Sequence, residues 1–232
     1  MVRLVPEVLA VYPHDDGSYT QGLLVDPAGR LFESAGRYGQ SDVREVEVAT
    51  GAVLRRHDLP DEVFGEGLAY VDGRLVVLTW KEGRAFVLDA DTFDSIGELS
   101  YDGQGWGLCF DGERLVMSDG SAQLRLRDPV TFEVLGSVTA TADGVPVAGL
   151  NELECVEGTV WANVYPTDRI VQIDPGSGRV LAEVEASSLT ARQEGLEAGE
   201  VLNGIAWDPA RGTFLVTGKH WDELYEVRFV PA

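Results

Sequence analysis

Five positions in the chain of 232 residues combine chemically useful side chains with a regular spacing. Each stands directly before a Gly-Leu pair or a close variant of it. They are Gln21, Glu66, Trp106, Asn151 and Asn203. One carboxyl group, three amides and an aromatic face could bind a polar substrate and move a proton on it. For Asn203 alone we favour the alternative in which the side chain caps a strand end through bonds to the backbone.

Glu66 is the candidate proton carrier of this set. Because it stands close to Phe64 and within reach of other aromatic residues, we expect desolvation to raise its pKa toward the range that suits proton transfer. Side chains at the ends of the predicted second strands can join it, namely Trp80, Tyr165 and Lys219. Lysine is most often a solvated surface cation, but the position of Lys219 favours a place in the site.

The recurring pair also predicts the elements that position these residues. The copies start 40 to 52 residues apart, which is the length of one four-stranded propeller blade. Within each unit, short β-branched and aromatic runs alternate with Gly, Asp and Asn turns, and only Ser187 to Leu196 could form a helical turn. Since the first strand of each blade lines the channel of a propeller, the five residues are expected to meet in one axial pocket.

The last unit lacks a fourth strand, because Leu224 to Val230 is its third strand and the chain ends at Ala232. The strand-like segment Leu4 to Tyr12 could complete it and leave no exposed edge. We therefore predict an all-β fold, a five-bladed β-propeller of residues 1–232 in one domain, closed by an N-terminal strand that completes the last blade. A two-sheet sandwich would not explain five equally phased copies.

The composition narrows the possible partners. Hydrophobic residues make up 44% of the chain and charged residues 25%, which are ordinary globular values. The formal net charge of −21 opposes binding to nucleic acid or to an anionic membrane, and no window of about 18 apolar residues could span a bilayer. Cys109 and Cys155 lack a zinc-binding spacing and could form one disulfide, but we interpret them as buried free thiols.

The start of the chain, Met1 to Pro6, lacks the charged and apolar regions of a signal peptide. We expect a cytoplasmic protein, or a periplasmic or secreted one if a leader was trimmed. We also expect a monomer.

Nine short stretches, in order along nearly the whole chain, resemble the plant and bacterial type of glutaminyl-peptide cyclotransferase, the glutaminyl cyclases. Any one stretch is weak evidence, whereas nine collinear matches are specific. The stretches are Tyr19 to Leu23, Phe64 to Leu68, Leu78 to Lys81, Gly105 to Leu108, Met117 to Ser121, Leu150 to Glu154, Val160 to Asn163, Leu202 to Trp207 and Thr217 to Lys219. Tyr19 stands where the family often has phenylalanine, and Tyr165 where the plant pattern has tryptophan, so substrate preference is open.

The resemblance implies an aminoacyltransferase that cyclises the N-terminal glutamine of peptides to pyroglutamate and releases ammonia, without a metal or another cofactor. On this basis Glu66 would move the proton, and Lys219 and Asn151 would stabilise the oxyanion. The expected substrate-binding residues are Gln21, Tyr19, Phe64, Trp80, Trp106 and Tyr165.

Two other functions could use the same residues. The oxygens of Glu66, Asn151 and Asn203 resemble the ligands of calcium-dependent propeller lactonases, because Ca²⁺ prefers such donors. The tryptophans and the cation of Lys219 argue against that metal site. The third possibility is a non-catalytic propeller that only recognises peptide N-termini.

Overall fold

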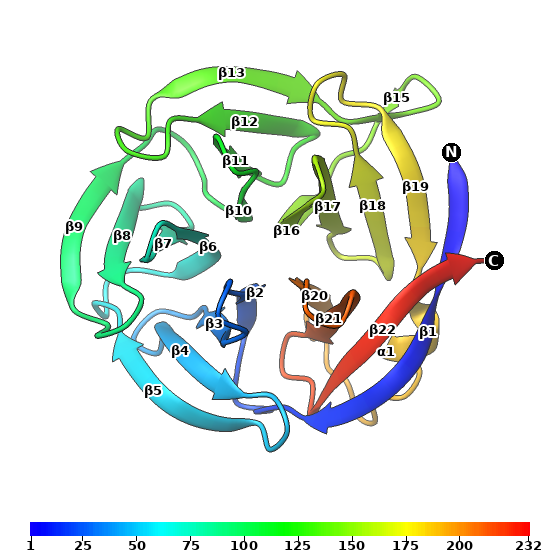
Figure 1. The fold of residues 1–232 in the computed structure, drawn as a ribbon, viewed down its shortest axis with the longest axis horizontal. Coiled ribbons are helices and arrows are strands. Elements are labelled where there is room, and N and C mark those ends of the chain that lie inside the picture. Colours follow the sequence, from blue (N-terminus) through cyan, green and yellow to red (C-terminus); the bar gives the residue numbers. More distant parts are fainter.

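The computed structural model describes all 232 residues, and almost all of its regular structure consists of β-strands. Figure 1 shows the four large sheets arranged around a central axis, with inner strands near the axis and outer strands at the periphery, as in a β-propeller. The one helix, α1 (Ser187–Thr190), lies within the segment where a helical turn was expected. No helix is long and apolar enough to cross a membrane.

Three sheets each contain four antiparallel strands in chain order. The first consists of β2 (Thr20–Val25), β3 (Leu31–Ala35), β4 (Asp42–Glu47) and β5 (Ala52–Asp58). The second consists of β6 (Gly65–Val71), β7 (Arg74–Thr79), β8 (Arg84–Asp89) and β9 (Ser95–Ser100). The third consists of β10 (Leu108–Phe110), β11 (Leu115–Met117), β12 (Gln123–Arg127) and β13 (Val134–Thr139). A separate hairpin is formed by β14 (Thr141–Ala142) and β15 (Val145–Pro146).

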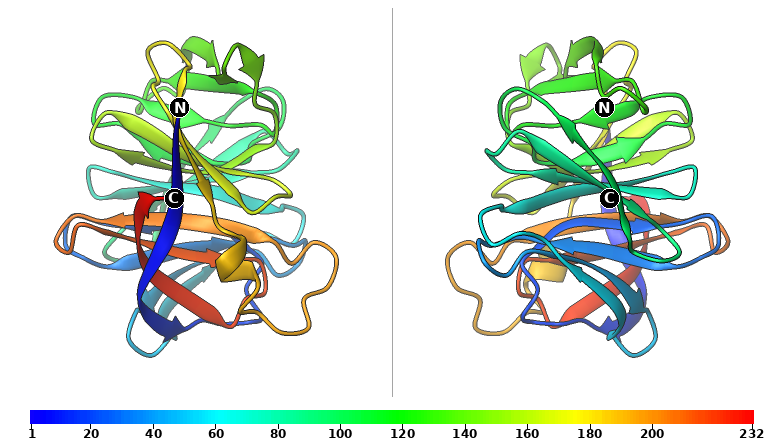
Figure 2. Two further views of the ribbon diagram at one scale, coloured as in Figure 1. Left: turned by 90° about the vertical axis from the view of Figure 1, so that its right-hand side faces the viewer. Right: turned by 90° about the vertical axis from the view of Figure 1, so that its left-hand side faces the viewer.

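The other eight strands form one sheet in the order β16-β17-β18-β19-β1-β22-β21-β20. Its strands are β16 (Leu150–Val156), β17 (Thr159–Val164), β18 (Arg169–Ile173), β19 (Val180–Glu185), β1 (Val2–Pro13), β22 (Glu223–Pro231), β21 (Thr213–Gly218) and β20 (Leu202–Asp208). The N-terminal strand β1 pairs antiparallel with β22 along most of its length and parallel with β19 at its start. As a result, the two termini lie on the same side of the molecule (Figure 2).

A shift of strand register accompanies the Gly-Leu pair in four of the five copies. The shifts lie between Thr20 and Gly22, Gly65 and Leu68, Leu150 and Leu153, and Leu202 and Ile205. Such bulges redirect a side chain relative to the regular alternation of a strand. They turn the residue before the pair toward the axis, which is where the sequence pattern placed it.

The glycine of the pair is required by close packing at the axis. A Cβ atom on Gly22 would lie 2.6 Å from the backbone nitrogen of Leu68, and one on Gly67 would lie 2.6 Å from that of Leu108. Any side chain there would push neighbouring first strands apart. The apolar core lies between the sheets, as in the cluster that packs Leu24 and Phe32 against Leu68 and Leu75.

The interpretation of the two cysteines as free thiols is wrong, because Cys109 and Cys155 form a disulfide. Cys109 lies on β10 and Cys155 on β16, the inner strands of neighbouring sheets. Their Cα atoms are 5.4 Å apart, which is within the range that a disulfide spans. The packing of β10 beside β16 brings together two residues that are 46 positions apart in sequence.

Candidate active site

One pocket lies at the axis, at the end where the residues before the Gly-Leu pairs gather. It has a volume of about 270 Å³. Its lining consists of Tyr19, Gln21, Phe64, Glu66, Trp80, Trp106, Asn151, Tyr165 and Lys219. These are the nine site residues that the sequence suggested, so the fold brings all of them together from four different sheets.

Glu66 is the carboxyl group of the pocket. It is 4% exposed, and its side chain accepts no hydrogen bond from the protein, although its backbone oxygen accepts one from Ser34. Burial raises the pKa of Glu66 well above its usual range, against the opposing charge of Lys219. A carboxyl group that is buried, unpartnered and open to a cavity is suited to exchange a proton with a bound molecule.

Lys219 follows β21 and is buried in the pocket wall, with 1% of its surface exposed. Its ammonium group donates to the backbone oxygen of Thr20 at 3.0 Å and to the side-chain oxygen of Gln21. Burial lowers the pKa of Lys219 to about 7, although the carboxyl groups of Glu66 and Glu152 oppose this effect. The protonation of Lys219, and so its positive charge, therefore depends on the charged groups around it.

The two asparagines of the motif differ in their contacts. The side-chain oxygens of both are buried without a hydrogen-bond partner in the protein, but only Asn151 lines the pocket, so its side-chain amide can bind a ligand. The amide of Asn203 instead donates to the backbone oxygen of Thr20 at 2.9 Å, and Asn203 does not line the pocket. The expected strand-capping contact of Asn203 is therefore present.

Five aromatic residues form a wall of the pocket, and the ring centroid of one of them, Tyr19, lies 4.4 Å from the ammonium group of Lys219. The rings of Tyr19 and Phe64 meet edge to face at 6.0 Å between centroids, those of Phe64 and Trp80 at 5.7 Å, and those of Trp106 and Tyr165 at 5.7 Å. The pocket therefore combines five aromatic side chains with four polar ones. A small polar molecule could thus be enclosed while its reacting atoms face Glu66 and Lys219.

Gln104 joins the two tryptophans of this wall, and the sequence analysis did not identify it. Its side-chain oxygen accepts a hydrogen bond from the indole of Trp80 at 2.8 Å and from that of Trp106 at 3.1 Å. Gln104 lies two residues before Trp106 and outside every repeated motif, so no pattern in the sequence points to it.

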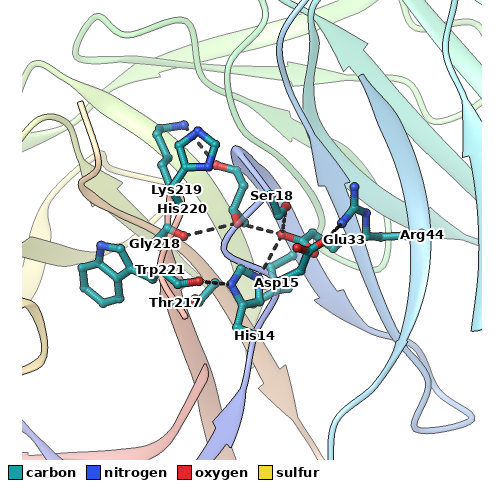
Figure 3. Close-up of polar contacts among 12 residues, drawn as sticks. His14, Asp15, Ser18, Glu33, Arg44, Thr217, Gly218, Lys219, His220 and Trp221 are labelled. Carbon is teal, nitrogen blue, oxygen red and sulfur yellow. Dashed lines mark hydrogen bonds and ion pairs between the residues drawn. The ribbon is translucent and has the colours of Figure 1, made fainter. Parts of the chain in front are cut away.

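A buried ion pair between His14 and Glu33 contacts two chain segments that carry pocket residues (Figure 3). His14 lies 3.1 Å from Glu33 through Nε2 and 2.7 Å from the backbone oxygen of Trp221 through Nδ1. Glu33 also accepts hydrogen bonds from the hydroxyls of Ser18 at 2.6 Å and Thr20 at 2.7 Å. This cluster therefore connects the segment that carries Tyr19 and Gln21 to the turn that follows Lys219.

The pKa values of the pair reflect these contacts. Burial alone would lower the pKa of His14, but the charge of Glu33, the hydrogen bonds to Glu33 and Trp221 and the charge of Asp15 together outweigh burial, so that the pKa is raised. Burial also opposes the charge of Glu33, yet His14 and the other donors lower its pKa to about 2. Both groups are therefore charged over a wide range of pH.

Groups of three or more His, Cys, Asp or Glu side chains placed to hold a metal ion are absent from the structure. Glu66 is the only carboxyl group that lines the pocket, and it shares the pocket with a lysine.

Comparison with known proteins agrees with this geometry. The glutamine cyclotransferase family matches residues 1–229 of the chain. The glutaminyl-peptide cyclotransferase of Arabidopsis thaliana is 38% identical over 229 residues, which cover 97% of this chain and 72% of that protein. The crystal structure of Myxococcus xanthus glutaminyl cyclase has a TM-score of 0.94 and 36% identity, and the match covers 100% of this chain and 99% of that one.

A more distant likeness concerns the fold alone. The β-propeller domain of Cps50 (Swd1) from Myceliophteria thermophila has a TM-score of 0.55 at 11% identity, over 96% of this chain and 99% of that one. The family match over residues 1–229 and the 38% identity to the Arabidopsis thaliana protein show that the chain belongs to the glutamine cyclotransferase family.

Proposed function

We propose that this protein cyclises the N-terminal glutamine of peptides to pyroglutamate and releases ammonia, without a catalytic metal. The observation that carries the proposal is the pocket itself, in which the buried and unpartnered carboxyl of Glu66 and the ammonium group of Lys219 line a small cavity with an aromatic wall. Membership in the family supports the same reaction.

The reaction forms a bond between the α-amino nitrogen and the side-chain carbonyl carbon, and it breaks the bond from that carbon to the amide nitrogen. The nucleophile and the carbonyl belong to one residue, so holding that residue curled supplies much of the rate advantage. Glu66 takes a proton from the attacking amine and returns it to the departing nitrogen, which leaves as ammonia. Since the proton is only relayed, one carboxyl group serves both steps.

Charge develops on the carbonyl oxygen during the attack. Lys219 and the amide of Asn151 stabilise it, and such groups act strongly where water is excluded. The aromatic wall encloses the glutamine side chain and keeps out water that could hydrolyse it. Gln21 orients the peptide carbonyl next to Lys219, with which it already shares a hydrogen bond.

A metal-independent reaction fits the charge of this pocket. The cation of Lys219 would repel a metal ion bound to Glu66 and Asn151. Asn203, the third ligand that a calcium-dependent lactonase would use, does not line the pocket. Both features favour the cyclase over the lactonase.

We count five blades and one domain of residues 1–232. The eight-stranded sheet divides into two blades of four strands, β16 to β19 and β20 to β22 with β1, and the short parallel pairing of β1 with β19 joins them. Five copies of the Gly-Leu pair support the same count.

The partners that we propose are peptides or proteins with an N-terminal glutamine, bound by a monomer. The net charge of −21 supports the absence of nucleic acid and anionic membranes among its partners. The Cys109–Cys155 disulfide favours an oxidising compartment over the cytoplasm.

The test is incubation of the protein with a peptide that begins with glutamine, followed by measurement of ammonia and of the peptide mass. The proposal predicts ammonia in equal amount to cyclised peptide, with and without a chelator. Binding of the peptide with no ammonia released would indicate the non-catalytic propeller. Hydrolysis of a lactone that a chelator abolishes would indicate the calcium-dependent enzyme.

A further inference from the structure

Glu152 occupies a position that is otherwise held by glycine. In the other four copies of the motif, the residue after the site residue is Gly22, Gly67, Gly107 or Gly204. Glu152 is completely buried and does not line the pocket. A carboxyl group is costly to bury without partners, so its contacts indicate what it does.

The carboxyl of Glu152 bridges β2 and β20, the inner strands of two neighbouring sheets. It accepts a hydrogen bond from the backbone nitrogen of Leu23 on β2 at 3.4 Å and another from that of Ile205 on β20 at 2.8 Å. Inner strands have an unpaired edge at the axis, and this carboxyl satisfies two of the free amide groups. Gln21 lies two residues before Leu23, so Glu152 fixes the backbone that carries the partner of Lys219.

Glu152 also acts on Lys219 through its charge. The charged groups that face Lys219 are Glu66, Glu152 and Arg37. Burial and the neighbouring Glu154 raise the pKa of Glu152 well above its usual value, and the two amide groups and the charge of Lys219 oppose this rise. Glu152 and Lys219 therefore each favour the charged form of the other.

The two carboxyl groups near Lys219 differ in their partners. The side chain of Glu66 accepts no hydrogen bond from the protein and lines the pocket. Each side-chain oxygen of Glu152, in contrast, accepts a hydrogen bond from a backbone amide, and Glu152 does not line the pocket. Hydrogen bonds donated to a carboxylate favour its charged form. Of the two carboxyl groups, Glu152 is therefore the one whose protein contacts favour a carboxylate.

We propose that Glu152 is a positioning residue of this site. It holds β2, which carries Gln21, against β20, and it remains the counter-charge of Lys219 while Glu66 exchanges its proton with the substrate. This inference rests on the function proposed above for Glu66. Glu152 touches no substrate, and its effect reaches the reaction through Lys219.

The composition offers a direct test, because the chain has only two lysines, Lys81 and Lys219. In protein labelled with ¹³C at lysine Cε, NMR can follow the titration of Lys219, and Lys81 serves as the internal reference. Glu152→Gln removes the charge and should lower the pKa of Lys219 by about one unit or more. The matched control is Glu154→Gln, which changes the next carboxyl on the same strand. It should leave the pKa of Lys219 unchanged or slightly raised, because loss of Glu154 favours the charged form of Glu152.

Glu66→Gln provides the second arm and mimics the protonated carboxyl. Lys219 should still carry its charge at pH 6 in this variant. Loss of that charge, or a Lys219 titration in Glu152→Gln that matches the wild type, would overturn the proposal. The Glu66→Gln arm decides the question even if Glu152→Gln does not fold.

Activity is measured separately on the wild type. If the wild-type protein releases no ammonia from the glutamine peptide, the proposed function fails whatever the titrations show. If the wild type cyclises the peptide but Lys219 does not respond to Glu152, only the role of Glu152 fails.

Discussion

Three glutamates on inner strands differ in their contacts, and these contacts give each a different role. Glu66 has no protein partner, Glu152 accepts two backbone amide groups, and Glu154 accepts one from Trp207 at 3.0 Å. Burial raises the pKa of all three. Only Glu66 also opens to the pocket, so it is the only one that can pass its proton to a substrate.

At the scale of single residues, Gln104 holds the two tryptophans of the aromatic wall in place through hydrogen bonds to their indoles. Gln104→Leu should release both indoles and lower kcat/KM about tenfold, because two hydrogen bonds of about 1 kcal/mol or less each are lost. The effect should fall mainly on KM, since the aromatic wall binds the substrate but takes no part in proton transfer. Steady-state kinetics with a glutamine peptide measure both constants.

Gln104→Glu is the control, because its carboxylate can still accept both indole hydrogens. It should restore most of the lost KM. If Gln104→Leu leaves KM unchanged, Gln104 does not position the tryptophans.

At the scale of elements, the pocket depends on how the strands end and meet. The register shifts direct the motif residues to the axis, and the His14–Glu33 pair connects the end of β1 to β3 and to the turn after β21. The strands themselves follow from sequence patterns, but this connection does not, because its partners lie in loops and on separate sheets.

Glu33→Gln should lower the free energy of unfolding by about 3 kcal/mol or more, as expected when one partner of a buried ion pair is removed. The control Glu45→Gln changes a partner of Arg55 nearer the surface and should cost about 1 kcal/mol or less. Urea unfolding at pH 7 measures both variants. Equal effects of the two substitutions would contradict the supporting role of the pair.

The pair also has a predicted pH dependence. The folded pKa of Glu33 is about 2, below its ordinary value of 4.5, so its contribution is complete above pH 4.5 and is lost as the pH falls toward 2. The pKa of His14 is raised above 6.5, so its contribution is complete below pH 6.5 and is lost as the pH rises. In Glu33→Gln the loss of stability between pH 4.5 and 2 should therefore be smaller than in the wild type.

At the scale of the whole molecule, the repeat made much of the fold predictable. The predicted strand Leu224–Val230 lies within β22, and the predicted strand Leu4–Tyr12 lies within β1, the partner of β22. All nine predicted pocket residues line one cavity, because equivalent positions of a ring meet at its axis. Their catalytic roles remain predictions.

Contacts between different copies were not predictable in the same way. Cys109 and Cys155 are adjacent only because neighbouring inner strands meet, and their place on first strands was a signal that could have indicated it. Glu152 breaks the glycine pattern of the motif, which was a second signal. Gln104 has no counterpart in the other copies, so only the folded ring could reveal it.

The disulfide should stabilise the ring. Replacing both cysteines with Cys109→Ser and Cys155→Ser should lower the free energy of unfolding by about 4 kcal/mol, given the 46-residue separation of the two cysteines. Cyclisation should persist below the new unfolding temperature, because neither cysteine lines the pocket. Denaturant unfolding with and without a reductant measures the effect. A wild type that reductant does not destabilise would contradict it.

The most direct test of the account is the turnover of Glu66→Gln on a peptide with N-terminal glutamine. The account predicts that ammonia release falls at least about 100-fold, while the variant folds and still binds the peptide. Glu98→Gln, which changes a carboxylate on the outer strand β9, should keep wild-type turnover as the control. Near-normal ammonia release by folded Glu66→Gln would contradict the assignment of Glu66 as the proton carrier.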